Sequence, residues 1–340
     1  MSRRFYLDAS PGERRAVVTL DGKPERLIVE RDGEASRARL GARYAARVRQ
    51  IEPGLGLAFL DLGEDGEAVV PLGRHGIAEG MAVEAEIVAE ARRGKTATAG
   101  YGGPTPHPIG LIRPGPTAAE RLRDLSMGAA IIEGEAASEA ADVAEEAVLE
   151  VEHPLPGGGS IAVEPTRALV AVDVDVGAKG GGDAGRLARQ VNQAAVAEAA
   201  RLLRLKALGG LVVFDVVGKG QDGEALTAAA RKAFAPDEPG VVYGPVSKLG
   251  TLTLALPRRW RPTLEALADA GGTLTPRTLA QRLVRALERE GRADPGARLE
   301  AVCASVVAGE LRPLAAQLGP RFRVREEVGR VAGDADIRSL

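Results

Sequence analysis

Three aspartates stand where two apolar runs end, and their type and spacing could hold a divalent cation. The first run, residues 169–175, ends in Asp173 and Asp175, and the second, residues 211–215, ends in Asp215. Because side chains alternate along a strand, Asp173 and Asp175 are expected on one face. Gathered carboxylates repel each other unless a hard cation lies between them, and Mg²⁺ takes oxygen ligands while keeping waters for a phosphate substrate. The pattern therefore indicates a magnesium site.

The segment that joins the two runs predicts a crossover that would bring the three acids together. A glycine-rich turn over residues 177–182 precedes a helix expected from Gly185 to Leu208, which Gly209-Gly210 would end as a C-cap. A strand, helix, strand unit of this length joins parallel strands by a right-handed crossover. If the strands are neighbours, the three aspartates lie in the crevice where open α/β sheets hold their sites.

Simpler interpretations stay open for these motifs. Each aspartate could cap the helix or turn that follows it, and only the presence of three acids on one crossover modestly favours the metal site. Gly94-Lys95-Thr96 resembles the end of a P-loop, but Ala89 stands where that motif needs a glycine. The glycines at 177–182 lack dinucleotide-binding spacing, so a nucleotide-cofactor fold is not expected.

The elements around the aspartates predict an α+β multidomain protein. In chain order the patterns indicate a β-hairpin (4–30), a small barrel of short strands (40–100), a Gly/Pro-rich linker (100–116), helices flanking a strand (117–150), an alternating α/β domain (160–255) and a C-terminal unit of helices with one strand (276–340). The α/β part carries the acids.

The composition narrows the class of protein. Apolar residues make up 45% and charged residues 27% of the 340 residues, which is typical of a soluble globular protein. The apolar runs are too short to cross a bilayer and no signal-like segment follows the N-terminus, so a cytoplasmic protein without membrane contact is predicted. Cys303 is the only cysteine, which excludes an intramolecular disulfide and a multi-cysteine zinc site. With a net charge of −2, any RNA binding must come from local basic patches.

Several segments resemble the ribonuclease E/G family. Residues 155–161 and 164–169 are similar to the family's stretch before its first catalytic aspartate, and residues 204–215 to the stretch before the second. Residues 51–55 and 58–63 resemble the family's RNA-binding barrel. The similarity runs in order along nearly the whole chain.

The resemblance implies a fold and a mechanism. It implies an RNase H-like portion (1–36 and 105–150) with an inserted OB-fold, S1-type barrel (37–104), a DNase I-like catalytic α/β domain (151–268) and a small C-terminal α/β domain (275–340). Asp173 and Asp215 stand at the family's two magnesium-binding catalytic aspartates, and Asp175 stands at a family asparagine that orients the reacting groups. A metal-activated water would then attack the phosphodiester of single-stranded RNA and leave a 5′-phosphate and a 3′-hydroxyl.

The same resemblance assigns RNA contacts to the barrel. Phe59 matches an aromatic expected to stack on a base, Lys95 lies where the barrel has a basic RNA contact, and Arg47 and Arg49 could add phosphate contacts. Phe59 could equally be a core aromatic of the barrel, and for the three basic residues a solvated surface is slightly favoured.

Departures from the family pattern leave more than one function open. No 5′-monophosphate sensor follows the barrel, and residues 267–272 lack the Cys-x-x-Cys of the zinc link, so neither 5′-end sensing nor a zinc-linked dimer is expected. Val69 replaces a second barrel aromatic, Gly218 replaces a family acid, and Asp175 replaces the asparagine. We therefore predict an active endoribonuclease, with an RNA-binding protein of weak or lost catalysis as the alternative and a small-substrate phosphoesterase as a remote third. The C-terminal unit could mediate an oligomer.

Overall fold

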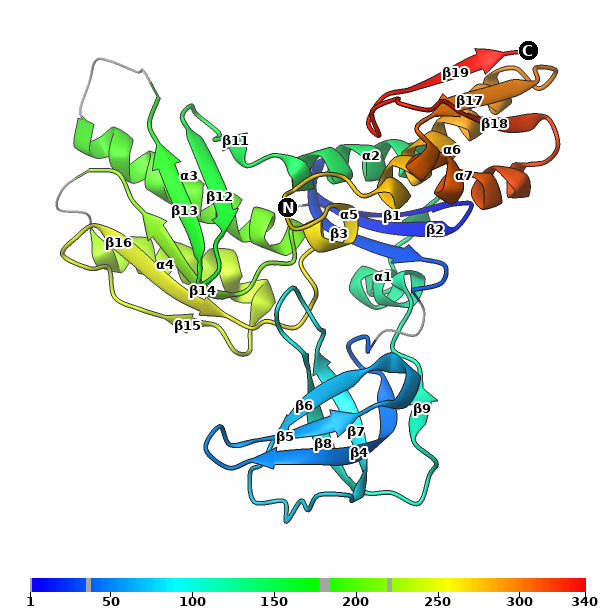
Figure 1. Ribbon diagram of the computed structural model, residues 1–340. Helices are drawn as coiled ribbons and strands as arrows, with labels where there is room; N and C mark the ends of the chain where they lie inside the picture. Colours follow the sequence, from blue (N-terminus) through cyan, green and yellow to red (C-terminus); the bar gives the residue numbers. More distant parts are fainter. Residues whose placement is uncertain (1, 35–37, 178–183, 219–221) are drawn as a thin grey trace.

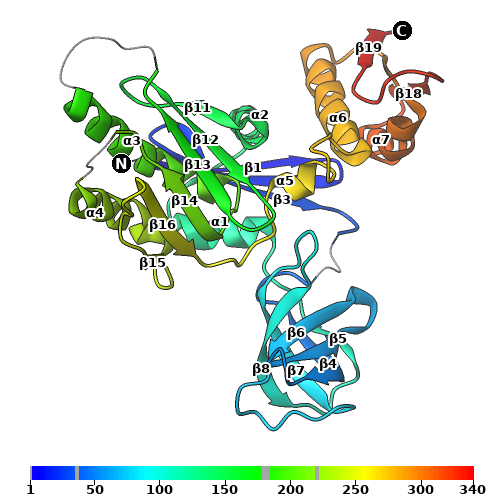
Figure 2. The ribbon, with the colours of Figure 1, turned by 60° about the vertical axis from the view of Figure 1, so that its left-hand side comes forward.

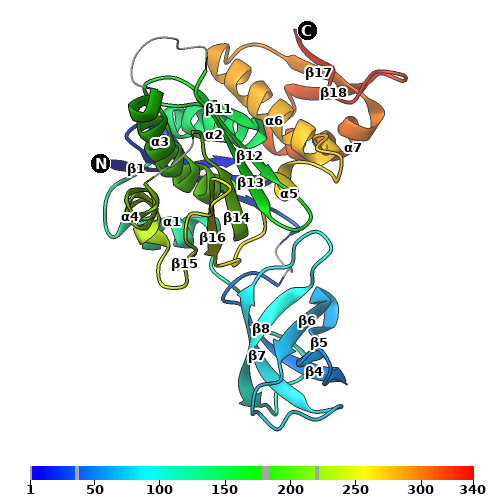
Figure 3. The same ribbon diagram turned by 90° about the vertical axis from the view of Figure 1, so that its left-hand side faces the viewer.

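The computed structural model describes residues 2–34, 38–177, 184–218 and 222–340. Figure 1 shows a β-barrel that projects from one end of the molecule, a large sheet backed by helices, and a small C-terminal unit, with an N-terminal sheet between them. Figures 2 and 3 show the barrel projecting in the same way from two other directions. The mixed α+β class is as predicted.

The N-terminal sheet has helices on both faces. Its order is β10-β1-β2-β3, from β1 (Arg3–Ser10), β2 (Glu13–Leu20), β3 (Lys23–Arg31) and β10 (Ile131–Ile132). Side chains alternate along β2, so Ala16 and Val18 pack with α1 (Ala118–Ser126) while Val17 packs with α2 (Glu135–Leu149). The predicted hairpin over residues 4–30 is therefore part of a three-stranded meander, because Gly12 at φ 74° allows one more tight turn.

The barrel is closed. Its strands are β4 (Arg43–Glu52), β5 (Leu57–Asp61), β6 (Glu67–Pro71), β7 (Ala82–Ala89) and β8 (Ala97–Pro104), with the short helix η1 (Gly63–Asp65) between β5 and β6. They pair in the order β5-β6-β8-β7-β4, and pairing of β4 with β5 closes the ring. A strand outside the ring, β9 (Gly110–Arg113), also pairs with β4. The core is aliphatic apart from Tyr44, in keeping with the low aromatic content.

The linker predicted over residues 100–116 is wrong in part, because β8 and β9 occupy much of it. The glycines that suggested a flexible segment serve close packing of the backbone instead. A Cβ added to Gly102 would lie 3.1 Å from the carbonyl oxygen of Glu84 on the neighbouring strand β7. Glycine in this strand therefore reflects contact between backbones.

The large sheet has six strands in the order β11-β12-β13-β14-β16-β15. They are β11 (Glu152–Pro154), β12 (Ser160–Pro165), β13 (Val170–Asp175), β14 (Gly210–Asp215), β15 (Val242–Tyr243) and β16 (Thr251–Leu256). Only β13 and β14 run parallel, and α3 (Ala184–Leu205) connects them. The helices α4 (Gly223–Phe234) and η2 (Ala235–Asp237) lie between β14 and β15.

The end of α3 differs from the prediction. The helix ends at Leu205, and Ala207 adopts the left-handed conformation, with φ 51°, that glycine usually supplies. The backbone N–H of Leu208 donates to the carbonyl of Leu203 at 2.9 Å, which is the bond of a Schellman turn. Gly209-Gly210 therefore does not cap the helix, and Gly210 is the first residue of β14.

The C-terminal unit is a three-stranded sheet with two long helices. After α5 (Leu264–Leu267) come α6 (Pro276–Ala293), β17 (Leu299–Cys303), α7 (Ser305–Leu318), β18 (Phe322–Glu326) and β19 (Ala335–Ser339). The prediction of a single strand is wrong, because β17 pairs with both β18 and β19. These strands of five residues lie among helices and give too short a pattern to identify from sequence.

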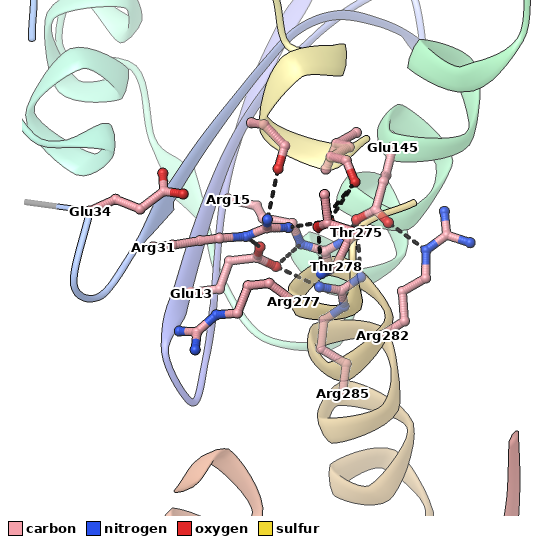
Figure 4. A network of polar contacts seen from close by, with 12 residues as sticks. Glu13, Arg15, Arg31, Glu34, Glu145, Thr275, Arg277, Thr278, Arg282 and Arg285 are labelled. Carbon is pink, nitrogen blue, oxygen red and sulfur yellow. Dashed lines mark hydrogen bonds and ion pairs between the residues drawn. The ribbon is translucent and has the colours of Figure 1, made fainter. Parts of the chain in front are cut away.

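A buried ion-pair network joins the C-terminal unit to the N-terminal sheet (Figure 4). Arg285 on α6 donates to Glu13 at 2.5 Å and to Glu145 on α2 at 3.0 Å. Arg15 has no solvent exposure, and its guanidinium reaches Asp8 at 2.6 Å and Glu145 at 3.1 Å. Removing one partner of a buried ion pair strongly lowers the free energy of unfolding. The network therefore fixes how α6 packs against β2 and α2.

No helix within the described ranges is both long enough and apolar enough to span a membrane.

Candidate active site

Two of the three aspartates lie side by side at the carboxyl ends of parallel strands. The register between β13 and β14 pairs Asp173 with Asp215. Neighbouring strands are about 4.8 Å apart, so the two carboxylates can reach a common ligand between them. The prediction that the two apolar runs form adjacent parallel strands joined by a helical crossover is confirmed.

All three aspartates point away from the helices. Val172, Val174 and Phe214 face α3 and α4 and are buried, whereas the aspartates that alternate with them are exposed. The opposite face also carries Leu211, which is 42% exposed. Figure 1 shows this face toward the viewer, with α3 behind the sheet.

The crevice expected beyond the strand ends stays a prediction, because residues 178–183 and 219–221, which follow β13 and β14, lie outside the described residues. The described residues place the three acids on the sheet face that α3 and α4 leave uncovered. The physical reason is that the helices following β13 and β14 both pack on the same side of the sheet. An open face admits a long polymer more readily than a small molecule.

The three carboxylates differ in their hydrogen bonds. Asp175 accepts a bond from the backbone N–H of Gly177 at 2.9 Å, which is the turn-capping role that the sequence left open. Asp173 and Asp215 accept none from the residues that the structure describes, so their oxygens face solvent. The acids thus divide into a turn-capping residue and a pair that is available to a ligand.

The available pair fits a magnesium ion. Mg²⁺ is commonly bound by one or two carboxylates together with waters and substrate phosphate oxygens. Two exposed, adjacent carboxylates provide that donor set. Within the described ranges there is no cluster of three or more His, Cys, Asp or Glu side chains able to hold a metal. The predicted glycine turn at Gly180, Gly181 and Gly182 lies outside the described residues.

Asn192 is a candidate positioning residue that the sequence analysis missed. It is buried on α3, and its amide donates to the carbonyl of Val217 at 3.0 Å while accepting from the N–H of the same residue at 3.0 Å. Both bonds hold the backbone two residues beyond Asp215. The available signal was a lone asparagine next to Val191 in the apolar stripe of α3.

The four barrel residues expected to contact RNA are all on its surface. Phe59 is half-buried and points outward, because its neighbours Ala58 and Leu60 fill the barrel core. Arg47 and Arg49 are exposed on β4, and Arg49 pairs with Glu67 at 2.6 Å. Lys95 is exposed in the turn between β7 and β8. Phe59 is therefore available for stacking.

The structure does not bring these barrel residues to the aspartates. The carboxyl ends of β13 and β14 lie at the end of the large sheet that is remote from the barrel, in Figures 1 and 3 alike. An RNA that touched both would have to cross the body of the molecule or contact a second copy.

Residues 135–259 match the family model described as Ribonuclease E/G family. This segment contains Asp173, Asp175 and Asp215 and the strands that carry them, whereas the barrel lies outside it. The resemblance predicted from the sequence is thereby confirmed for this segment.

The chain is also similar to curated proteins. Ribonuclease E of Escherichia coli (strain K12) is 32% identical over 156 residues, which cover 43% of this chain and 15% of that protein. Ribonuclease E of Haemophilus influenzae is 34% identical over 116 residues, covering 33% of this chain and 12% of that protein. A chloroplastic ribonuclease E/G-like protein of Arabidopsis thaliana is 30% identical over 125 residues, covering 35% of this chain and 12% of that protein. The matches span less than a sixth of these relatives.

Proposed function

We propose that this chain, whose residues 135–259 match the ribonuclease E/G family, is a magnesium-dependent endoribonuclease. It would cut single-stranded RNA internally, without sensing the 5′ end, and leave a 5′-phosphate and a 3′-hydroxyl. The observation that carries the proposal is the register pair of Asp173 and Asp215, exposed and without protein partners in the described ranges.

The residues of the chain have separate roles in this proposal. Asp173 and Asp215 hold the cation, and Asn192 fixes the backbone that follows Asp215. When bound, Mg²⁺ supplies an activated water and neutralises charge on the phosphate. The uncovered face of the sheet lets an RNA strand lie across the strand ends, so the phosphodiester reaches the carboxylates without entering a pocket.

The finer family features belong to the same proposal. The closed barrel would act as an OB-fold, S1-type RNA-binding module through Phe59, Lys95, Arg47 and Arg49. The N-terminal sheet would correspond to the RNase H-like portion and the large sheet to the DNase I-like domain. We further propose that the protein acts in the cytoplasm and that any oligomer forms through the C-terminal unit rather than a zinc link.

Cleavage of a labelled RNA tests the proposal. A 5′-labelled, unstructured RNA should be cut internally with Mg²⁺ and left intact with EDTA. Asp215→Asn should abolish the cuts, because it removes one of the two carboxylates that hold and position the cation. Glu152→Gln, on the exposed edge of the same sheet, should cut as the unmodified protein does. RNAs with a 5′-triphosphate and a 5′-monophosphate should be cut at equal rates.

An RNA-binding protein with lost catalysis is the second candidate. It is favoured by Asp175, which stands at the family's asparagine and is engaged by Gly177. RNA binding without Mg²⁺-dependent cuts, unchanged by Asp215→Asn, would establish that alternative. If Asp175→Asn then produced cuts, the added carboxylate would be the cause of the loss.

A further inference from the structure

A groove lined by arginines and by Trp260 lies between β3, α1 and the segment after β16. None of the three aspartates lines it. Three adjoining cavities share the walls formed by Ala207 and Trp260. The middle one, of about 220 Å³, is lined by residues of β3, α1, the end of α3 and the segment after β16. Because four separate parts of the chain form its walls, the cavity exists only when they are packed together.

Arg121 on α1 has a desolvated charge that no carboxylate of the described chain neutralises at close range. Its guanidinium carbon lies 3.5 Å from the centre of the Trp260 ring, and no ion pair within 4.0 Å is formed among the described residues. Burial lowers the pKa of Arg121 to about 10, and the nearby charge of Arg26 adds to the effect, whereas Glu90 opposes it. A guanidinium in this state gains from an incoming anion.

The nearest acids are already engaged elsewhere. Glu90 accepts hydrogen bonds from the backbone N–H groups of Leu40 at 3.2 Å and of Arg261 at 2.9 Å. Glu30 pairs with Arg39 at 2.8 Å and accepts from the N–H of Ala118 at 2.7 Å. These bonds direct the two carboxylates toward other donors, and neither forms an ion pair within 4.0 Å of the Arg121 guanidinium.

Arg26, from β3, lines the same cavity and is also poorly compensated. Its closest carboxylate is that of Asp237, at 3.8 Å, and the pair makes no hydrogen bond. Burial lowers the pKa of Arg26, and the neighbouring charge of Arg204 adds to the effect, with Asp237 opposing it. Arg204 itself is held by Glu25 at 3.0 Å and by Asp237 at 2.6 Å. The cavity therefore presents two cations to whatever enters it.

The remaining walls are apolar. Leu27, Ile28, Pro116 and Leu125 line the cavity, and the exposed Asp124 is the one acidic residue of its lining. Arginine binds phosphate oxygens, and an apolar wall beside an arginine-stacked indole suits a flat ring. On the barrel side the groove continues into a cavity of about 320 Å³ whose lining includes Glu30, Glu34, Asp65, Glu67 and Glu90. These carboxylates repel further phosphate groups, so the lining favours a single nucleotide unit in the arginine-lined cavity.

We propose that this cavity binds a nucleoside monophosphate group, with the phosphate on Arg26 and Arg121 and the base against the apolar wall. The group could be a free nucleotide or one unit of an RNA strand. The choice of a nucleotide over other anionic aromatic compounds rests on the proposed function, but the site itself does not depend on cleavage.

The only tryptophan of the chain lies in this cavity and reports its occupancy. Adenosine 5′-monophosphate should change the fluorescence of Trp260 in a saturable manner, and adenosine or inorganic phosphate should bind at least tenfold more weakly. Arg121→Gln and Arg26→Gln should each weaken nucleotide binding about tenfold or more. Calorimetry should measure these two affinities, because Arg121→Gln also alters the surroundings of the indole. Arg123→Gln, exposed on the same helix, should bind normally.

Further experiments distinguish a free nucleotide from an RNA strand as the ligand, and nucleotide binding from RNA cleavage. A short single-stranded RNA that competes with the nucleotide would identify the strand as the source, and lack of competition would identify the free nucleotide. Asp215→Asn should bind the nucleotide unchanged even if it cuts no RNA, so failure of one proposal is distinguishable from failure of the other. Absence of saturable binding, affinity unaffected by both arginine changes, or phosphate binding as tightly as the nucleotide would each overturn the assignment.

Discussion

Arg285→Met tests whether the buried ion-pair network fixes the C-terminal unit to the N-terminal sheet. The substitution keeps the apolar stem of the side chain but removes the charge that lies between Glu13 and Glu145. All three side chains are at most 4% exposed, so the two carboxylates would lose a partner without gaining water. Breaking a buried ion pair in this way costs roughly 3–5 kcal/mol.

The lower end of that range is expected because both carboxylates keep other partners. Glu13 retains Arg31 at 2.7 Å, and Glu145 retains Arg15 at 3.1 Å and Arg282 at 2.6 Å. We therefore expect the free energy of unfolding to fall by about 3 kcal/mol. Urea denaturation followed by circular dichroism measures it, and limited proteolysis shows whether α6 detaches first.

Two comparisons make the result decisive. Arg292→Met, on the same helix, removes an exposed pair with Glu288 and should cost about 0.5 kcal/mol or less. Adding Glu13→Gln to Arg285→Met should cost less than the sum of the two single changes, because the uncompensated charge is removed. If Arg285→Met is no more destabilising than Arg292→Met, the network does not fix the C-terminal unit and the reasoning is refuted.

Three further results are expected. Burial, with Lys206 and Arg201 nearby, lowers the pKa of His153, so the folded chain takes up this proton only at a lower pH than the unfolded chain, which does so near pH 6.5. Stability should therefore fall as the pH drops below 6.5, by up to about 1.4 kcal/mol per pH unit. His153→Leu should remove this part of the urea-midpoint shift between pH 7.5 and 5.5. Asn192→Ala should lower the RNA cleavage rate about tenfold and raise the Mg²⁺ concentration needed, because two bonds to the backbone after Asp215 are lost. Phe59→Ala should weaken RNA binding about fivefold to a hundredfold, measured by fluorescence anisotropy, since one base loses its stacking partner.

Matched variants control these three results. His107→Leu, at an exposed position, should leave the pH dependence of unfolding unchanged, and an equal effect at both histidines would contradict the argument. Gln193→Ala, exposed beside Asn192, should cleave normally. Phe59→Tyr keeps the ring and should bind RNA nearly as tightly as the unmodified protein; if Phe59→Ala binds equally well, the barrel does not use this aromatic.

Much of the local structure could be predicted from the chain because it depends on neighbours in sequence. The runs ending in Asp173 and Asp215 are strands, the intervening apolar stripe is a helix, and alternation places Asp173 and Asp175 on one face. Predictions that rested on glycine and proline alone were less successful. Gly102 lies in a strand of the barrel, and Ala207 supplies the left-handed turn at the end of α3.

The sequence by itself determined that a parallel crossover would bring acids together at one sheet edge, and its motifs identified the family resemblance. Only the tertiary structure decided which face of the sheet stays open, because that depends on the side to which α3 and α4 both pack. It also decided that the barrel stands away from the acids and that Arg121 meets Trp260 across the fold. Such contacts join residues far apart in the chain, and no local sequence pattern encodes how the sheets and helices that create them pack together.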